Sequence, residues 1–159
     1  MRDTFPVRIE DLPIDFDMGF DHLYGLELLE INDGLVRGRV AVRDEIKQPA
    51  GLVHGGIYAA VAESLATTGT VVAVLSEGNM AMGLSNQTSF LRPATEGTIH
   101  AEARARHRGR TTWVWEVELT NDAGKLCALS RVTVAVRPAP PASDGKPAAE
   151  GDASRSSGG

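Results

Sequence analysis

The chain has 159 residues, of which 42% are hydrophobic and 23% charged, so it is long enough for one globular domain and too short for two comfortable ones. Its net charge of −5 argues against a broad nucleic-acid-binding surface, and a single cysteine, Cys127, excludes an internal disulfide and a cysteine-cluster metal site. Neither a basic-then-apolar leader nor an unbroken apolar stretch of about 18 residues is visible, so we expect a soluble, cytoplasmic protein with no membrane partner.

The first predicted elements are a short helix and a hairpin. Residues 15–24 are expected to form a short helix or turn. Apolar or alternating runs follow at residues 26–31 and 35–42, and the Asn-Asp-Gly between them supplies the positive-φ positions that favour a β-hairpin.

Residues 55–75 are the longest predicted element. They are rich in alanine, and their apolar side chains go nearly all the way round the helical period, which predicts an α-helix packed on most sides. Gly78 follows as a helix-stop signal. Two features break the apolar pattern: Gly55 and Gly56 open the helix, and Glu63 lies in its middle.

Four strands are predicted after the helix. They cover residues 80–91, 98–108, 111–120 and 126–136. The third strand places Trp113, Trp115, Val117 and Leu119 on one face, as expected of a half-buried strand. Two strands, one long helix and four antiparallel-looking strands predict an α+β domain whose helix lies across one sheet face.

The composition changes at residue 138. From there to residue 159 the chain has no Val, Ile, Leu, Met or aromatic residue, so it can bury little surface to offset its chain entropy. We therefore expect a folded domain over residues 1–137 and a disordered tail over residues 138–159.

The start of the long helix has the properties of an oxyanion site. A helix start carries unpaired N–H groups and a partial positive charge, and glycines such as Gly55 and Gly56 let a ligand approach the backbone. Glu63 follows Gly55 by eight residues. That is about 12 Å along the axis, too far for both to act on one carbonyl. If both are catalytic, two subunits must share the site, for example through antiparallel helices across a two-fold axis.

Each of these residues also has a structural interpretation. A glutamate in a helix is usually solvated, whereas burial beside Ala and Leu would raise the pKa of Glu63, as a general acid or base requires. Thr67 lies one turn further on the same face, where its hydroxyl can position a water or satisfy the carboxylate. The alternative role of His54 is that of an N-terminal hydrogen-bonding residue, and the alternative role of the two glycines is close packing.

Several segments together resemble the hotdog-fold acyl-CoA thioesterases. They are Gln48 followed by GLVHGG, the pair Ala62-Glu63, SNQTSFLRP at 85–93, TTWVWEVELTNDAGKLCALS at 111–130, and AVRP at 135–138. The resemblance covers nearly everything from Asp21 to Pro138 and is greatest to the 4-hydroxybenzoyl-CoA thioesterase type, which carries its essential carboxylate as a helix glutamate. It implies a hotdog fold, in which an antiparallel sheet wraps a long helix, paired into homodimers and usually homotetramers.

The resemblance also implies roles for individual residues. Glu63 would act on the thioester as a nucleophile, through an acyl-enzyme anhydride, or as a general base on water. The N–H of Gly55 from the other subunit would polarise the thioester carbonyl. Gln48 and Thr67 occupy positions that orient the reacting group and the water, and His54 lies beside the oxyanion site. No cofactor or metal is expected, because the four histidines form no ligand motif.

Three further positions match substrate contacts in this family. Asp21 matches a residue that contacts the ring hydroxyl of the benzoyl group, and its alternative interpretation is a solvated residue ending a short helix. Arg110 and Thr111 fall where the family contacts the nucleotide end of CoA, whose phosphates favour guanidinium groups. Basic residues that follow the last strand in the relatives are replaced here by Ala139-Pro-Pro. Candidates to compensate for them are Arg92, Arg106, Arg108 and Arg137.

These features predict hydrolysis of an aromatic acyl-CoA resembling 4-hydroxybenzoyl-CoA, in aromatic degradation. Phenylacetyl-CoA and 1,4-dihydroxy-2-naphthoyl-CoA are alternative substrates. A non-catalytic acyl-CoA-binding hotdog protein would not require Glu63, Gln48 and Thr67 together. A hotdog dehydratase would pair an aspartate with a histidine in a different motif, and the chain has no Gly-x-Ser-x-Gly elbow of a serine hydrolase.

Overall fold

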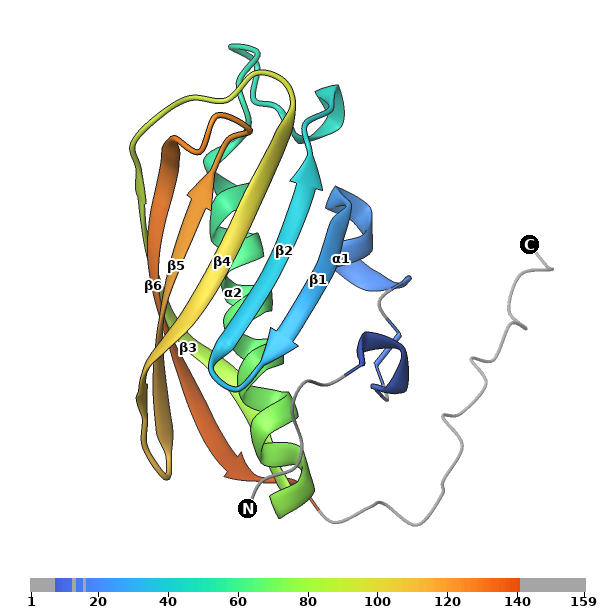
Figure 1. Cartoon of the computed structure of the whole chain (residues 1–159), viewed down its shortest axis with the longest axis vertical. Helices are drawn as coiled ribbons and strands as arrows, with labels where there is room; N and C mark the ends of the chain where they lie inside the picture. Colours follow the sequence, from blue (N-terminus) through green and yellow to red (C-terminus); the bar gives the residue numbers. More distant parts are fainter. Residues whose placement is uncertain (1–7, 13, 16, 141–159) are drawn as a thin grey trace, which may run out of the picture.

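A six-stranded antiparallel sheet curves around one long helix (Figure 1). The computed structural model describes residues 8–12, 14–15 and 17–140. The strands are β1 (Leu26–Asn32), β2 (Leu35–Ala41), β3 (Asn79–Phe90), β4 (Thr98–Arg108), β5 (Thr112–Thr120) and β6 (Leu126–Pro138). Their order across the sheet is β1-β2-β4-β5-β6-β3, so β1 and β3 form its edges. The predicted α+β hotdog architecture is confirmed.

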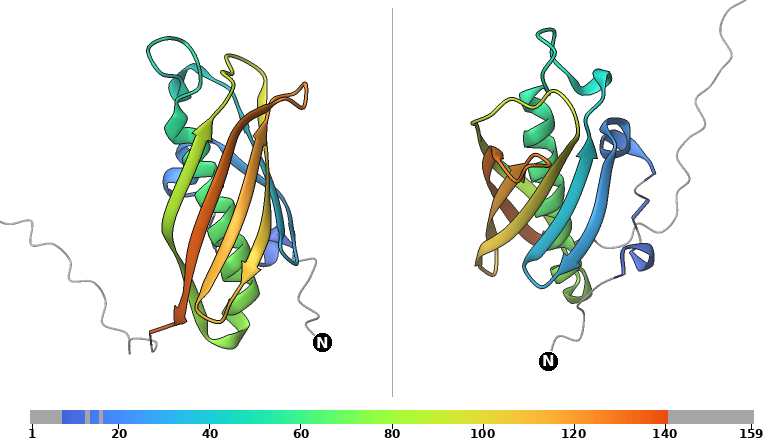
Figure 2. Two further views of the ribbon diagram at one scale, coloured as in Figure 1. Left: turned by 90° about the vertical axis from the view of Figure 1, so that its left-hand side faces the viewer. Right: turned by 45° about the horizontal axis from the view of Figure 1, so that its top comes forward.

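The helix α2 (Gly55–Val74) lies across the concave side of the sheet and packs against all six strands (Figure 2). A 3-10 turn, η3 (Leu75–Glu77), continues it, and Gly78 ends it with φ of 72°, as the stop signal predicted. By length and composition the segment Gly55–Glu77 could cross a membrane, but half of its most apolar window is buried inside this fold. It is the core helix of the domain.

Smaller elements lie beside β1 and at the start of α2. They are η1 (Ile9–Asp11), α1 (Gly19–Tyr24) and η2 (Asp44–Ile46). Helix α1 begins later than predicted from residues 15–24, because the backbone N–H of Asp17 bonds the Asp15 carboxylate at 3.0 Å and Met18 is extended. Such local side-chain bonds compete with helix formation. Residue 16, within the predicted helix, lies outside the described residues.

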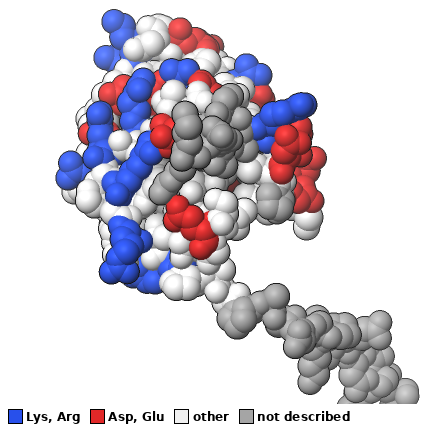
Figure 3. Space-filling model, turned by 60° about the horizontal axis from the view of Figure 1, so that its bottom comes forward, with Lys and Arg blue, Asp and Glu red and all other residues white. Residues whose placement is uncertain are grey.

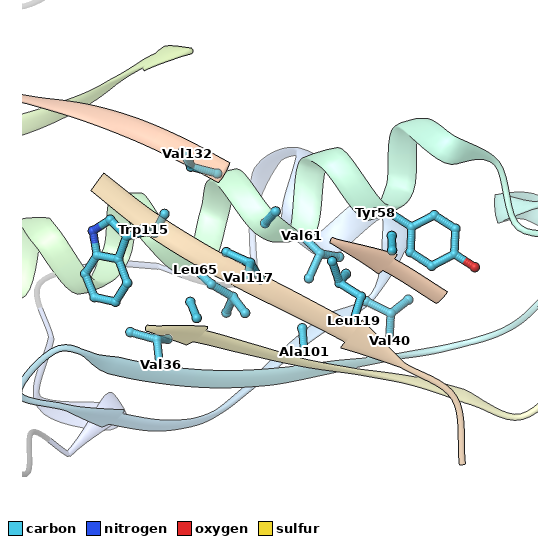
Figure 4. Packing of buried hydrophobic residues seen from close by; sticks show 14 of the residues in the cluster. Val36, Val40, Tyr58, Val61, Leu65, Ala101, Trp115, Val117, Leu119 and Val132 are labelled. Carbon is cyan, nitrogen blue, oxygen red and sulfur yellow. The ribbon is translucent and has the colours of Figure 1, made fainter. Parts of the chain in front are cut away.

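The core fills the space between α2 and the middle of the sheet. The predicted inward face of β5, from Trp113 to Leu119, is buried as expected. Figure 4 shows Val61 and Leu65 of α2 pointing towards the side chains of the strands, with Trp115 at one end of the cluster and Tyr58 at the other. A buried chain of hydrogen bonds ties the two layers together: Trp115 Nε1 donates to Thr70 Oγ1 at 2.9 Å. That hydroxyl in turn donates to the carbonyl of residue 66 at 2.8 Å.

Strand β6 continues to Pro138, one residue past the predicted end of the domain. From residue 141 onward, the predicted tail of residues 138–159 lies outside the described residues. Its disorder and the domain boundary both stay predictions.

Candidate active site

The N-terminus of α2 has one backbone donor that nothing in the described part of the chain uses. His54 is the N-cap residue, and its Nδ1 accepts a hydrogen bond from the N–H of Gly56 at 2.9 Å. The N–H of Gly55 takes part in no hydrogen bond among the described residues. Because this N–H lies at the positive end of the helix dipole, it can bind an oxygen that gains negative charge. The interpretation of His54 as an N-terminal hydrogen-bonding residue is therefore confirmed.

A hollow of about 590 Å³ opens beside this N-terminus. It is lined by Gln48, Leu52, Val53, Gly55, Tyr58, Phe90, Leu91, Arg92 and Pro93. Gly55 is covered by the ring of Phe90, because a Cβ at Gly55 would lie only 2.9 Å from Phe90 Cζ. Gln48 and Gly55 of one chain thus line the same hollow, and Phe90 of β3 adds an aromatic wall that the sequence did not indicate.

Tyr58 of α2 also lines this hollow. Tyr58 is 3% exposed, and its hydroxyl has no hydrogen-bond partner within the described ranges. Burial raises the pKa of Tyr58 to about 12. The hydroxyl points away from the core residues drawn in Figure 4, so the tyrosine extends the apolar core to the edge of the hollow.

Glu63 lies in the middle of α2, away from this hollow. Its side chain is exposed, and its carboxylate lies against β3, where a Cβ at Gly83 would be 2.8 Å from Glu63 Oε1. Thr67 is one turn further along α2, and its buried hydroxyl has no partner in the part of the chain that the structure describes. Within one chain, Glu63 therefore lies on the same helix as Gly55 but does not line the hollow at the helix N-terminus.

Asp21 is held by two hydrogen bonds, one of them from Ser64, the residue that follows Glu63 in α2. Its Oδ1 accepts from Tyr24 Oη at 2.6 Å and from Ser64 Oγ at 2.7 Å, which ties α1 to α2. Burial, followed by the bond to Asp21, raises the pKa of Tyr24, so this hydroxyl keeps its proton and remains a donor. The carboxylate is half-buried rather than solvated, and its Oδ2 has no hydrogen bond within the described residues. Nothing in the sequence indicated the contact with Ser64, because 43 positions separate the two residues.

Arg110 and Thr111 lie at the opposite end of α2, in the β4–β5 turn at the bottom of Figure 1. A hollow of about 330 Å³ there includes Arg110, Arg108 and Val74. Arg110 has no ion pair or hydrogen bond within the described residues, whereas Arg137 Nη1 donates to the carbonyl of Thr111 at 3.0 Å. Figure 3 looks at this end and shows Lys and Arg side chains gathered along one side of the molecule.

Of the four candidate arginines, Arg137 donates to backbone carbonyls and two others form ion pairs. Arg106 pairs with Glu116, and Arg108 pairs with Asp33 at 2.6 Å. Arg92, by contrast, lines the hollow at Gly55 and has no ion pair among the described residues. No group of three or more His, Cys, Asp or Glu side chains in the described ranges could hold a metal ion.

Comparison with known proteins places this geometry in a family. Residues 50–128 match the thioesterase superfamily. Over 120 residues the chain is 31% identical to the 1,4-dihydroxy-2-naphthoyl-CoA hydrolase of Listeria monocytogenes, covering 76% of this chain and 97% of the relative. The chain belongs to the thioesterase superfamily. It is accordingly a thioester hydrolase.

Solved structures of this superfamily share the fold. The chain superposes on a thioesterase of Pseudomonas aeruginosa with a TM-score of 0.74 and 32% identity, covering 77% of this chain and 88% of that one. A thioesterase of Staphylococcus aureus gives a TM-score of 0.71 and 30% identity, covering 74% and 97%. The S. aureus protein has been crystallised with a glutamine changed to alanine and with a glutamate changed to alanine, at positions fifteen residues apart. Gln48 and Glu63 are also fifteen residues apart.

Proposed function

We propose that the chain hydrolyses an aromatic acyl-CoA thioester of the 4-hydroxybenzoyl-CoA type to the free acid and CoA, at a site shared by two copies. The observation that carries this proposal is the division of the machinery along α2. Gly55 has an N–H at the helix N-terminus that bonds to no described residue, and Glu63 has a carboxylate about 12 Å away on the same helix. Two antiparallel helices related by a two-fold axis bring each acid to the other's N-terminus.

The exposed edge of the sheet supports this pairing. Strand β3 is an edge strand, and it exposes Met82 and Leu84, which are 45% and 58% accessible. An unpaired apolar edge of this kind is a template for pairing with another strand. Pairing β3 of two copies about a two-fold axis would extend the sheet and bring the two α2 helices side by side. We include this homodimer, its further assembly into a homotetramer and a cytoplasmic location in the proposal.

The same arrangement gives CoA a path. If Gly55 faces Glu63 of the partner subunit, the end of the partner's helix, eleven residues further on, lies about 16 Å beyond Gly55. The hollow at that end is lined by Arg110, which has no ion pair among the described residues. A thioester held at Gly55 can therefore extend its pantetheine arm towards a guanidinium that suits phosphate, with Arg92 at the near end.

The reaction follows from the groups assembled there. The N–H of Gly55 binds the carbonyl oxygen and stabilises the negative charge that it gains when the thioester carbon is attacked. In one route the Glu63 carboxylate attacks that carbon, CoA leaves as the thiolate, and water hydrolyses the resulting anhydride. In the other route Glu63 takes a proton from water, which attacks, and the proton passes to the departing sulfur. Gln48 orients the carbonyl side and Thr67 the water.

Asp21 supplies a basis for choosing the acyl group. Tyr24 and Ser64 occupy one carboxylate oxygen, which leaves the other free to accept a hydrogen bond from a ring hydroxyl. Asp21→Ala should therefore reduce kcat/KM for 4-hydroxybenzoyl-CoA about tenfold or more, and that for benzoyl-CoA much less. Equal losses for the two substrates would mean that Asp21 does not read the hydroxyl.

A second substrate is favoured by two of the relatives. The L. monocytogenes protein and an Escherichia coli protein, 30% identical over 120 residues, are both named 1,4-dihydroxy-2-naphthoyl-CoA hydrolases. That thioester also carries a hydroxylated ring, so the same Asp21 oxygen could serve it. The ratio of kcat/KM for the two hydroxyaryl thioesters, with phenylacetyl-CoA and an alkyl-CoA as controls, decides between them.

The test of the proposal is a thiol-release assay with Glu63→Ala and Glu63→Gln. Both variants should lose about 1,000-fold or more in kcat while still binding the thioester. Near-wild-type turnover by Glu63→Ala would remove the mechanism. Full activity of a monomer, measured by sedimentation at assay concentrations, would remove the shared site. Binding of a thioester without cleavage of any member of the panel would instead favour a ligand-binding protein.

A further inference from the structure

Strand β3 carries a bulge beside the middle of α2. In its pairing with β6, Gly83 lies opposite Val134 and Ser85 opposite Thr133, so Leu84 is an extra residue. Bulges of this kind change which side chains face which side of a sheet, and they are over-represented next to active sites. The question is therefore which side chains this bulge redirects.

The bulge places Gly83 and Asn86 on the same side. Residues three apart in a regular strand face opposite sides, because side chains alternate. Here, however, both positions face α2: Gly83 lies against Glu63, and Asn86 Nδ2 donates to the carbonyl of Ala59 at 2.8 Å. The extra residue at Leu84 therefore brings both residues to the turn of the helix that carries the acid.

Gly83 provides the space in which the Glu63 carboxylate lies. A Cβ at Gly83 would be 2.8 Å from Glu63 Oε1 and 3.3 Å from its Cδ. Because the carboxylate is the end of a flexible, exposed side chain, it could move away from an added methyl at little cost in stability. A side chain at Gly83 would therefore displace the Glu63 carboxylate and leave the stability of the fold nearly unchanged.

Asn86 fixes the backbone of the same turn. In an α-helix the carbonyl of Ala59 also accepts the N–H of Glu63, so the Asn86 amide holds the carbonyl at the base of that turn. The amide is itself oriented, because Thr88 Oγ1 donates to Asn86 Oδ1 at 2.8 Å. The Thr88 hydroxyl is 2.7 Å from that of Ser130 on β6. This chain of contacts connects the helix turn to the second strand from the edge.

We propose that the β3 bulge positions Glu63 for catalysis: Gly83 leaves the place of the carboxylate empty, and Asn86 anchors the helix turn beneath it. The inference rests on the proposed function, because it takes Glu63 as the reacting group. Gly83 and Asn86 are positioning residues that touch no substrate. In a site shared by two subunits, the acid must meet a carbonyl held by another chain, so a displacement of about 1 Å can cost about 100-fold in rate.

The first test is Gly83→Ala, alone and combined with Glu63→Ala. The single variant should lose about tenfold or more in kcat, with KM, thermal midpoint and dimer content near wild type. Added to Glu63→Ala, it should cause no further loss, because the carboxylate that it displaces is already absent. A wild-type kcat in Gly83→Ala, or an equal further loss in the Glu63→Ala background, would overturn the inference.

The second test separates the donor of Asn86 from its shape. Asn86→Asp keeps the acceptor for Thr88 but cannot donate to the Ala59 carbonyl, and Asn86→Ala removes both contacts. Both variants should lose about threefold to tenfold in kcat with KM retained. Gln87→Ala is the matched control, because it removes an amide from the opposite, exposed side of β3. An equal loss in Gln87→Ala, or losses confined to KM or to dimer content, would contradict the positioning role.

The two proposals fail in distinguishable ways. Wild-type turnover in Glu63→Ala would overturn both. Loss of turnover in Glu63→Ala, together with wild-type kcat in Gly83→Ala and Asn86→Asp, would leave the proposed function intact and remove the inference alone.

Discussion

The middle of the sheet and its β3 edge meet the same helix in different ways. On the β5 side, α2 packs through large apolar side chains: Trp115 of β5 and Leu65 of α2 are both fully buried, and the indole N–H donates to Thr70. On the β3 side, the helix meets a glycine and an asparagine, and it leaves Glu63 exposed.

The β5 side of the helix supports the fold, whereas the candidate site residues Glu63 and Thr67 lie towards the β3 side. Packing alone explains the residues of the β5 side within one chain. On the β3 side, Met82 and Leu84 are exposed and the buried Thr67 hydroxyl has no partner among the described residues. The packed side holds the helix rigidly, and in the proposed homodimer the open side would present Glu63 and Thr67 to a second copy.

The packed side should be the more sensitive to truncation. Trp115→Ala removes a fully buried ring and leaves the Thr70 hydroxyl without its donor, so we expect a loss of about 3–5 kcal/mol in the free energy of unfolding. Urea unfolding followed by far-UV circular dichroism measures it. Leu75→Ala, at an exposed position just after α2, is the control and should lose much less. Comparable losses would mean that β5 does not dominate the packing.

An added methyl should separate the two sides further. A Cβ at Gly69 would lie 2.6 Å from Trp115 Cη2 and 2.7 Å from Val36 Cγ2, and a packed ring cannot move aside easily. We therefore expect Gly69→Ala to lose about 1–3 kcal/mol of stability while keeping kcat per folded molecule. Gly83→Ala should do the reverse. Thermal unfolding and kinetics normalised to folded protein test this on both variants. Equal changes in stability and in kcat in the two variants would show that the two sides of the helix do not differ.

A smaller effect is expected where α1 meets α2. Tyr24→Phe removes the hydroxyl that donates to Asp21 at 2.6 Å, a bond expected to contribute about 0.5–1.5 kcal/mol. Because Ser64 still donates to Asp21, the carboxylate should stay near its place, and hydroxyaryl turnover should fall only a few-fold. Urea unfolding and kcat/KM for 4-hydroxybenzoyl-CoA measure the two effects. A loss of turnover as large as that of Asp21→Ala would show that Tyr24 does more than hold the carboxylate.

The smallest effect concerns a pair far from the site. The hydrogen bond from His100, followed by that from the N–H of Thr98, lowers the pKa of Asp122 below its usual 3.8. A lowered carboxyl pKa contributes stability above pH 3.8 or so, and this is lost as the pH falls through the folded-state value. His100→Ala should therefore be slightly less stable than wild type at pH 6, and the difference should shrink towards pH 3. Urea midpoints across this range measure the difference in stability between the two proteins. A difference that grows as the pH falls would contradict the conclusion that His100 lowers the pKa of Asp122.

Local pattern was sufficient for the fold. The period of two in β5 predicted which of its side chains are buried, and the nearly all-round apolar surface of residues 55–75 predicted a helix packed on most sides. Both succeed because burial of alternate or all faces follows directly from side-chain direction along a strand or helix. Residues 15–24 were predicted as a short helix or turn, and the structure has a turn at Asp17 before the helix, because an aspartate turn competes there with helical hydrogen bonding.

Contacts between distant segments were not predictable in the same way. Ser64 is 43 positions from the Asp21 that it binds, and Asn86 is 27 positions from Ala59. Isolated polar residues such as these do not recur at a helix or strand spacing, so the sequence does not indicate which distant residue each one contacts. The contact of Phe90 with Gly55 likewise depends on how β3 runs past the start of α2.

The sequence by itself determined the spacing along α2: eight residues from Gly55 to Glu63 fix a separation of about 12 Å, because a helix rises by a constant amount per residue. Only the tertiary structure decided what surrounds each of these residues. The bulge in β3 and the order of the strands set which side chains reach the helix, and neither is encoded in the period of any single segment.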